Sequence, residues 1–258
     1  MEADLLQEGE LERLLERERP ARVLLLAALA RIANCERSPR LAQAVNAELP
    51  ARVAAWCAAH GARLVHASTD LVFGASDAPR GGFREEQLTA PLSVYGASKA
   101  DGERAALAAH PAGLVVRLPL LYGDSHGRGL GASDSLLVAV ARGEQPTLFT
   151  DEWRTPLSAA AAGRALAELL FRPGAPSGLL HVAGPERVDR HTLGLRVLRG
   201  AGQSEARARE LIRASTRAEA GLAASRPRDV SLDCARARSW LESPLPDLAA
   251  GLGSGVGH

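Results

Sequence analysis

The chain has 258 residues, a length that suits one α/β domain with a substrate-binding extension. Its 31 basic and 30 acidic residues give a net charge of +1, which argues against a nucleic-acid or membrane surface as partner. Hydrophobic residues make up 46% of the chain and aromatic residues only 3%, which favours helices packed on a parallel sheet over an aromatic-rich sandwich.

The cysteines and the apolar runs indicate in which cellular compartment the protein is expected. The three cysteines are an odd number without CxxC spacing, so they indicate neither a disulfide framework nor a zinc site, and we predict no metal. The acidic first residues do not match a signal peptide, and the longest apolar run, residues 23–30, is too short to span a bilayer. We therefore expect a cytoplasmic protein.

The first half of the chain alternates between helical and strand patterns. Pro20 ends the first helix, and Gly61 closes the long helical stretch. The expected elements are a helix over 10–18, a buried strand over 23–28, a helical stretch from Ser38-Pro39 towards His60 that is interrupted at Pro50, and a strand over 63–67. A loop rich in Gly, Pro and Asp follows over residues 74–91.

The second half continues the alternation. The expected elements are helices over 94–109, 135–142, 159–171 and 190–199, and strands over 113–118 and 179–182. This order predicts an α/β fold with a Rossmann-like, doubly wound parallel sheet and a small C-terminal substrate-binding region. The Gly-rich tail over 251–258 is expected to be disordered.

Tyr95 and Lys99 lie four residues apart at the start of a predicted helix, so both side chains occupy one face. A reductase needs a tyrosine that protonates a carbonyl oxygen, and a neighbouring ammonium is expected to lower the pKa of that tyrosine. The bare spacing is a weak motif, but Lys99 is the one lysine of the chain, whose other 30 basic residues are all arginine. Arginine cannot replace a compact ammonium, so the spacing favours a catalytic pair over a chance surface pair.

The segment over 64–73 is a strand that ends in two hydroxyl residues, Ser68 and Thr69. Ligands of open α/β sheets bind beyond the carboxyl ends of the strands, so a substrate carbonyl is expected here. A capping or turn role for Ser-Thr-Asp is the alternative.

Together these segments resemble dTDP-4-dehydrorhamnose reductase, an extended short-chain dehydrogenase/reductase. The resemblance covers nearly the whole chain and rests on several motifs in combination. They are residues 44–47, 66–73, 83–86, 90–99, 117–123, 226–228 and 232–233.

The resemblance implies a role for each matching residue. Tyr95 would be the general acid, Lys99 would hold the nicotinamide ribose of NADPH or NADH, and Thr69 would hydrogen-bond the sugar carbonyl. Asn46 would support the proton relay, or would be a polar residue of the helix interior only. Ser68 would contact the cofactor, and the pair Asp4 and Leu5 resembles the acidic-hydrophobic pair that borders the adenine. The reaction implied is NAD(P)H-dependent reduction of a nucleotide-linked 4-keto sugar, as in dTDP-L-rhamnose biosynthesis.

The glycine-rich cofactor turn of such reductases has no counterpart among the 25 glycines. By the resemblance, Asp4 corresponds to a point after the third strand, so about two βα units would be absent. The strand over 23–28 would then be an exposed edge. Either the true start lies upstream, or another chain covers that edge. The expected division is a partial NAD(P)-binding domain over 1–125, a mixed sheet and substrate-binding region over 126–250, and the tail.

Two segments depart from the rhamnose enzymes. Residues 117–120 and 151–156 resemble the regulatory β subunit of methionine adenosyltransferase more closely, so a non-catalytic regulatory subunit is the alternative function. Partners would then be either a nucleotide sugar, with a possible homo-oligomer, or a partner protein. Arg154 is expected to bind the substrate diphosphate or to be a surface arginine, and His126 and Arg128 carry the same two readings.

Overall fold

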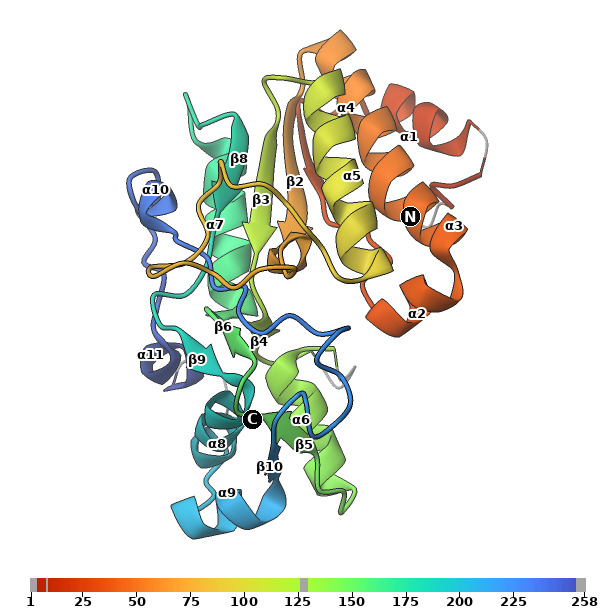
Figure 1. Cartoon of the computed structure of the whole chain (residues 1–258). Coiled ribbons are helices and arrows are strands. Elements are labelled where there is room, and N and C mark those ends of the chain that lie inside the picture. The colour runs from red at the N-terminus through yellow and green to blue at the C-terminus, as the bar shows by residue number, and fades with distance from the viewer. Residues whose placement is uncertain (1–3, 8, 126–129, 254–258) are drawn as a thin grey trace. The chain divides into compact units, whose positions relative to one another are not determined.

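The computed structural model describes residues 4–7, 9–125 and 130–253, and its chain forms two compact, interleaved units (Figure 1). Unit 1 comprises residues 1–73, 85–117 and 166–180, and unit 2 comprises residues 74–84, 118–165 and 181–258. The two units are therefore interleaved along the chain, and the functional division into residues 1–125, 126–250 and 251–258 stays a prediction.

The sheet of unit 1 has four strands in the order β1-β2-β3-β8, which confirms the predicted α/β class with a parallel sheet. The strands are β1 (Arg22–Leu25), β2 (Arg63–Thr69), β3 (Leu114–Leu118) and β8 (Gly178–His181). β1 pairs in parallel with β2, with Leu25 opposite His66. Among the described strands β1 lies at the margin of this sheet, as expected for the strand over 23–28.

The helices of unit 1 precede and follow β2. They are α1 (Glu10–Glu18), α2 (Ile32–Arg37), α3 (Pro39–Gln43), the π-helical segment η1 (Ala44–Glu48), α4 (Leu49–His60), the 3-10 segment η2 (Asp70–Val72) and α5 (Val94–Ala109). Leu11 and Leu15 of α1 pack with Val53 of α4 and with Leu25 and Leu64 of the sheet. This apolar core is built from aliphatic side chains, as the low aromatic content predicts.

Two boundaries differ from the sequence pattern. Pro50 does not end the helical stretch, because it directly follows the π-helical turn η1, in which the Leu49 N–H reaches back to the Ala44 carbonyl, and α4 continues beyond it. β1 ends at Leu25 instead of residue 28. The side-chain amide of Asn46 binds both the N–H and the C=O of Leu29, so these groups are not available to a strand ladder.

Helix α7 (Ala159–Phe171) contributes residues 166–171 to unit 1, and it lies on the other side of the sheet from α5 (Figure 1). The guanidinium of Arg22 in β1 stacks on the Phe171 ring at 5.2 Å. Val23, the next residue of β1, packs against the core formed with α1 and α4. Side chains of one strand thus reach helices on both faces, as in a doubly wound sheet.

Unit 2 consists of short paired strands and helices. Its elements are β4 (Leu121–Tyr122), α6 (Ala132–Ala141), β5 (Thr147–Phe149), β6 (Trp153–Arg154), β7 (Leu157–Ser158), β9 (Val188–Asp189), α8 (Arg190–Gly200), α9 (Glu205–Leu211), β10 (Arg213–Ser215), α10 (Ala235–Arg238) and α11 (Leu248–Gly253), with residues 159–165 of α7. β4 pairs with β7, β5 with β10, and β6 with β9.

The expectation of a disordered tail is wrong for residues 251–253, which end α11. Leu248 and Leu252 bury one face of this helix in the core of unit 2, and Gly251 lies against the Tyr122 ring, which leaves no space for a Cβ. Residues 254–258 lie outside the described residues.

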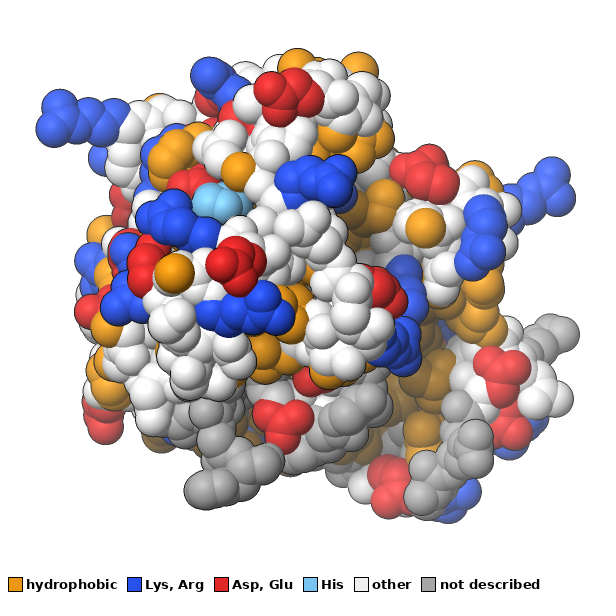
Figure 2. Space-filling view, turned by 90° about the horizontal axis from the view of Figure 1, so that it is seen from below, with side chains coloured by type: hydrophobic (Ala, Val, Ile, Leu, Met, Phe, Trp, Pro, Cys, Tyr) orange, Lys and Arg blue, Asp and Glu red, His pale blue; other side chains and the backbone are white. Residues whose placement is uncertain are grey.

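The charged surface is mixed in sign. On the face drawn in Figure 2, basic and acidic side chains are interspersed, in line with exposed pairs such as Arg17–Glu18 and Arg104–Asp101. No helix of the described residues is long and apolar enough to cross a membrane.

Candidate active site

The carboxyl end of β2 presents two buried hydroxyl residues. The Thr69 hydroxyl accepts a hydrogen bond from the Leu71 N–H at 3.2 Å and donates one to Asp70 Oδ1 at 3.2 Å, so it caps η2. The capping role weighed for Thr69 is therefore real, and it fixes the hydroxyl in place. Ser68 is 6% exposed, and its Oγ has no hydrogen-bond partner among the described residues. A buried hydroxyl of this kind has room in its hydrogen bonding for a water or a ligand group.

The first turn of α5 packs tightly against η2. The Ser93 hydroxyl accepts a hydrogen bond from the Gly96 N–H at 3.1 Å and caps the helix. A Cβ at Gly96 would overlap with the carbonyl of Leu71, so glycine is required for this close approach. Tyr95 lies on this first turn, where its phenol is near enough to the Thr69 hydroxyl for that group to favour the ionised form. Residues 26 positions apart in the sequence thus form one site.

The phenol of Tyr95 differs from the expectation in its acidity. Burial raises the pKa of Tyr95 to about 12, and the nearby Thr69 hydroxyl acts in the opposite direction without cancelling it. The sequence argument expected Lys99 to lower this pKa. That expectation is wrong for the described structure, because the Lys99 ammonium faces strand β2.

Lys99 is 2% exposed, and its contacts come from β2. Its Nζ donates a hydrogen bond to the Ala67 carbonyl at 2.7 Å and lies 3.4 Å from His66 Nε2. Burial lowers the pKa of Lys99 to about 8, although the Glu103 carboxylate one turn further along α5 favours the charged form. A lysine held in this state is typical of a functional site, because burial of an ammonium costs free energy.

Asn46 is fully buried and joins three segments. Its Oδ1 accepts from the Leu29 N–H at 2.9 Å, and its Nδ2 donates to the Leu29 carbonyl at 3.2 Å and to Ser98 Oγ at 3.0 Å. A Cβ at Gly102 would overlap with the Asn46 carbonyl, so η1 and α5 lie in contact. Asn46 therefore holds the loop after β1 against the helix that carries Tyr95 and Lys99, and its part in a proton relay stays a proposal.

Arg154 lies in unit 2 and is 5% exposed. Its guanidinium donates to Glu152 Oε1 at 3.2 Å and to the Trp153 carbonyl at 2.7 Å. Arg226 also binds Glu152, at 2.7 Å, and these guanidinium groups outweigh burial and hold the pKa of Glu152 below its usual value. The structure thus shows Arg154 as a buried, paired arginine rather than a surface one.

Of the other predicted positions, Asp4 and Leu5 make contacts within unit 1. The Asp4 carboxylate accepts from the Leu6 N–H at 3.0 Å, and Leu5 packs on the core of unit 1. Their contact with an adenine stays a prediction. His126 and Arg128 lie outside the described residues.

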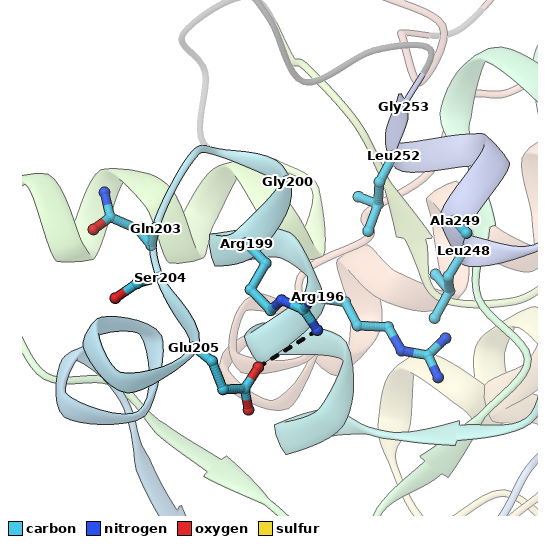
Figure 3. Close-up of a pocket in the computed structure, with 10 residues that line it drawn as sticks. All are labelled: Arg196, Arg199, Gly200, Gln203, Ser204, Glu205, Leu248, Ala249, Leu252 and Gly253. Carbon is cyan, nitrogen blue, oxygen red and sulfur yellow. Dashed lines mark ion pairs between the residues drawn. The ribbon is translucent and has the colours of Figure 1, made fainter.

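A cavity of about 730 Å³ opens in unit 2 between α8, α9 and α11 (Figure 3). Arg199 pairs with Glu205 across it at 3.4 Å, and Arg196 pairs with Glu186 at 2.5 Å. Because both guanidinium groups have carboxylate partners, the cavity offers an anion no unpaired arginine, and we assign it no part in the reaction.

Two residues of the site were not singled out in the sequence. His66 lies within the strand that ends at Thr69, and Glu103 lies one helical turn after Lys99. The alternation of strand side chains places His66 on the same face as Ser68, and helical spacing places Glu103 near Lys99. These two periodicities were therefore sufficient to select both residues from the sequence.

The residues at this site fit the nicotinamide end of a dinucleotide. Ser68 offers a buried hydroxyl without a partner among the described residues, and Lys99 offers a buried cation. The sequence holds no glycine-rich turn for the pyrophosphate. The fit is therefore to one end of the cofactor.

Comparison with known proteins identifies the family. The model of the RmlD substrate binding domain family matches residues 1–256. The chain belongs to this family. The dTDP-4-dehydrorhamnose reductase of Streptomyces griseus is 33% identical over 243 residues, which are 91% of this chain and 75% of that protein. The predicted resemblance to this class of reductases is confirmed.

The second resemblance is also confirmed. Methionine adenosyltransferase 2 subunit beta of Pongo abelii is 27% identical over 240 residues, which are 91% of this chain and 69% of that protein. Among solved structures, the dTDP-4-dehydrorhamnose reductase of Bacillus anthracis in complex with NADP superposes with a TM-score of 0.84 at 22% identity. The match covers 97% of this chain and 84% of that chain, and it supports the Rossmann-like fold.

Proposed function

We propose that this family member catalyses the NAD(P)H-dependent reduction of the 4-keto group of a nucleotide-linked sugar, most simply dTDP-4-dehydrorhamnose. The observation that carries the proposal is the close approach of α5 to η2 at Gly96, which brings Tyr95 near Thr69 at the carboxyl end of β2, with the buried Lys99 one turn further along α5. Family membership and the reductase relative support the same reaction.

Each residue has a chemical task in this proposal. The bound cofactor supplies the hydride that adds to the keto carbon. Thr69 hydrogen-bonds the carbonyl oxygen, and Tyr95 donates its phenolic proton to that oxygen as the C–O π electrons move onto it. A phenol with a pKa of about 12 is fully protonated at neutral pH, so the proton donor is present, and an alkoxide is the stronger base.

The remaining predicted contacts belong to the same proposal. Ser68 and Lys99 hold the nicotinamide end of the cofactor, with Asp4 and Leu5 at the adenine. Arg154 acts on the substrate diphosphate only by keeping Glu152 and Arg226 in place, since its own guanidinium is paired. Asn46 supports proton transfer by fixing α5 through Ser98.

A titration of the purified chain with NADPH, followed by nucleotide-sugar reduction, tests the proposal. We expect saturable quenching or enhancement of NADPH fluorescence and oxidation of NADPH that depends on dTDP-4-dehydrorhamnose. Tyr95→Phe should retain NADPH binding and lose turnover. Equal turnover in the wild type and the variant would contradict the proposed role of Tyr95.

A second candidate function is that of a non-catalytic regulatory subunit, supported by the similarity to methionine adenosyltransferase 2 subunit beta. The test is co-purification with a methionine adenosyltransferase from the same cells. A stable complex would favour this function over catalysis if its transferase activity is the same with the Tyr95→Phe variant as with the wild type.

A further inference from the structure

The ammonium of Lys99 lies between two acceptors of a single strand. The Ala67 carbonyl is 2.7 Å from Nζ, and His66 Nε2 is 3.4 Å from it. Lys99 is 2% exposed and His66 is fully buried. A buried ammonium must place its three N–H groups on acceptors, so the identity of each neighbour decides whether the charge is tolerated.

The imidazole of His66 can accept from Lys99 only in one form. If Nε2 carried a proton, two donors would face each other. If the ring were protonated, two cations would lie in contact inside the core. With an ammonium at Lys99 the proton is therefore on Nδ1, a buried atom for which no hydrogen-bond partner is found among the described residues, and the Nε2 lone pair is free for the ammonium.

The surroundings of His66 favour the neutral ring. Burial and the charge of Lys99 hold the pKa of His66 well below its usual value. On α5 the next titratable group is Glu103, which is engaged with Arg117 of β3 at 2.7 Å. On β1 the residue opposite His66 is the apolar Leu25, whose backbone favours the protonated ring without offsetting burial and the charge of Lys99. No carboxylate among these groups pairs directly with the imidazole.

We propose that His66 is a positioning residue for Lys99: its neutral ring, with the proton on Nδ1, accepts from the ammonium at Nε2 and holds it against the Ala67 carbonyl. Ala67 directly precedes Ser68, so the carbonyl that accepts from the ammonium belongs to the peptide unit that leads into the two hydroxyl residues of β2. The consequence for catalysis rests on the proposed function. The contact between His66 and Lys99 is present in the free protein, so it can be tested independently of the proposed function.

The single lysine makes the contact measurable. Protein labelled with ¹³C at the ε carbon of lysine gives one signal, from Lys99, whose titration reports its pKa without cofactor or substrate. We compare His66→Phe, which keeps an aromatic ring and removes the acceptor, with His66→Gln, which keeps an acceptor at similar reach. His110→Gln is the control, because the His110 ring lies at the Ala62 carbonyl instead.

We expect the pKa of Lys99 to shift in the His66→Phe variant only. Loss of a hydrogen bond to a charged group should lower the pKa of Lys99 in His66→Phe by about one unit, a tenfold change in protonation. His66→Gln and His110→Gln should stay close to the wild type. An unchanged pKa in a folded His66→Phe variant, or an equal shift in His66→Gln, would overturn the proposal.

A second measurement uses the wild type, so it does not depend on a variant that folds. Long-range ¹H–¹⁵N spectra report the tautomer of each histidine ring. His181 and His60 each have Nδ1 at a carbonyl oxygen, so the resonances of the His66 ring must be assigned individually. We expect the His66 ring to carry its proton on Nδ1 and not to titrate down to the lower end of the folded range. If the His66 ring carries its proton on Nε2, the proposal is wrong.

The enzymatic readout separates this proposal from the proposed function. If the chain reduces a nucleotide sugar, the alkaline limb of kcat/KM should move to lower pH in His66→Phe and return in His66→Gln. If no reduction is found but the Lys99 titration shifts as expected, the contact is supported and the proposed function fails.

Discussion

Two buried cations of unit 1, Lys99 and Arg117, are each 2% exposed and yet have opposite surroundings. Arg117 of β3 forms a bidentate pair with Glu103 of α5, with Nε–Oε1 at 2.9 Å and Nη2–Oε2 at 2.7 Å, and its guanidinium stacks on the Phe73 ring. Lys99 lies one turn before Glu103 on α5, and its two hydrogen-bond partners within the described part of the chain are neutral.

The difference separates a pair that stabilises unit 1 from a lysine that costs it stability. Glu103 has a single carboxylate, and the planar guanidinium of Arg117 takes both of its oxygens. The ammonium of Lys99 is left in a site that disfavours its charge. A lysine in such a site, in a chain whose other basic residues are arginine, supports the proposal that the β2–α5 contact is the functional end of unit 1.

The largest expected effect separates chemistry from packing at this end. Tyr95→Phe should reduce kcat by roughly 10²- to 10⁴-fold, because the proton donor is lost. The free energy of unfolding should change by about 1 kcal/mol or less, since one phenolic hydroxyl near Thr69 is removed. Steady-state kinetics and urea unfolding measure the two quantities, and a large loss of stability would make Tyr95 a packing residue instead.

The next effect tests the opposite region. Arg117→Met should lower the free energy of unfolding by about 3–5 kcal/mol, because the buried Glu103 carboxylate would lose its partner. The double variant Arg117→Met/Glu103→Met should recover most of this loss, since no unpaired charge remains. Urea unfolding of the three chains measures it. A double variant as unstable as the single one would show that the pair does not act as a unit.

Lys99→Met should raise the free energy of unfolding, whereas Arg117→Met should lower it. The folded pKa of Lys99, about 8, lies below the 10.5 of an unperturbed lysine, so below pH 8 folding must bury an ammonium at a cost. The variant should be more stable at pH 7 by about 1–3 kcal/mol, allowing for the hydrogen bond to Ala67 that is lost.

This advantage depends on pH in a defined direction. Between pH 8 and 10.5 the unfolded wild type binds more protons than the folded chain, so wild-type stability rises and the advantage of Lys99→Met fades. Chemical unfolding at pH 7, 9 and 10.5 measures this trend. An advantage that grows with pH would contradict the assignment of a lowered pKa.

The smallest effect is expected on the exposed face of the same helix. Arg104 is 71% exposed and pairs with Asp101 at 2.5 Å. Arg104→Ala should change the free energy of unfolding by about 0.5 kcal/mol or less, and the change should shrink further in salt. This variant is the matched control for Arg117→Met, and a loss of several kcal/mol would remove the contrast between exposed and buried pairs.

The elements that sequence reasoning predicted best are those whose ends carry local signals. The bounds of α1, α5 and α7 agree with prediction, and Gly61 ends α4 in a left-handed conformation. The strand over 23–28 was predicted too long because its end is decided by Asn46, whose side chain comes from a helix 17 residues later. Such a contact leaves no trace in the strand's own pattern.

The site also has features that the sequence predicted and features that it did not. Tyr95 and Lys99 were predicted from their spacing and Thr69 from its place at the end of a strand, and the structure places Tyr95 near Thr69 and Lys99 against β2. The sequence did not predict the acidity of Tyr95, because the pKa depends on burial and on the direction of the Lys99 side chain. Arg154 was expected at a ligand or at the surface, and only the fold reveals its pairing with Glu152.

The burial of the one lysine has a practical consequence for proteolysis. A protease specific for lysine has a single target, the bond after Lys99 in the middle of unit 1's longest helix, and the folded chain hides it. Cleavage requires α5 to open, so the rate of appearance of two fragments reports how often the β2–α5 contact opens in the native protein. Ligands that bind at this contact should slow the cut, which gives a screen that needs neither a chromophore nor a known reaction.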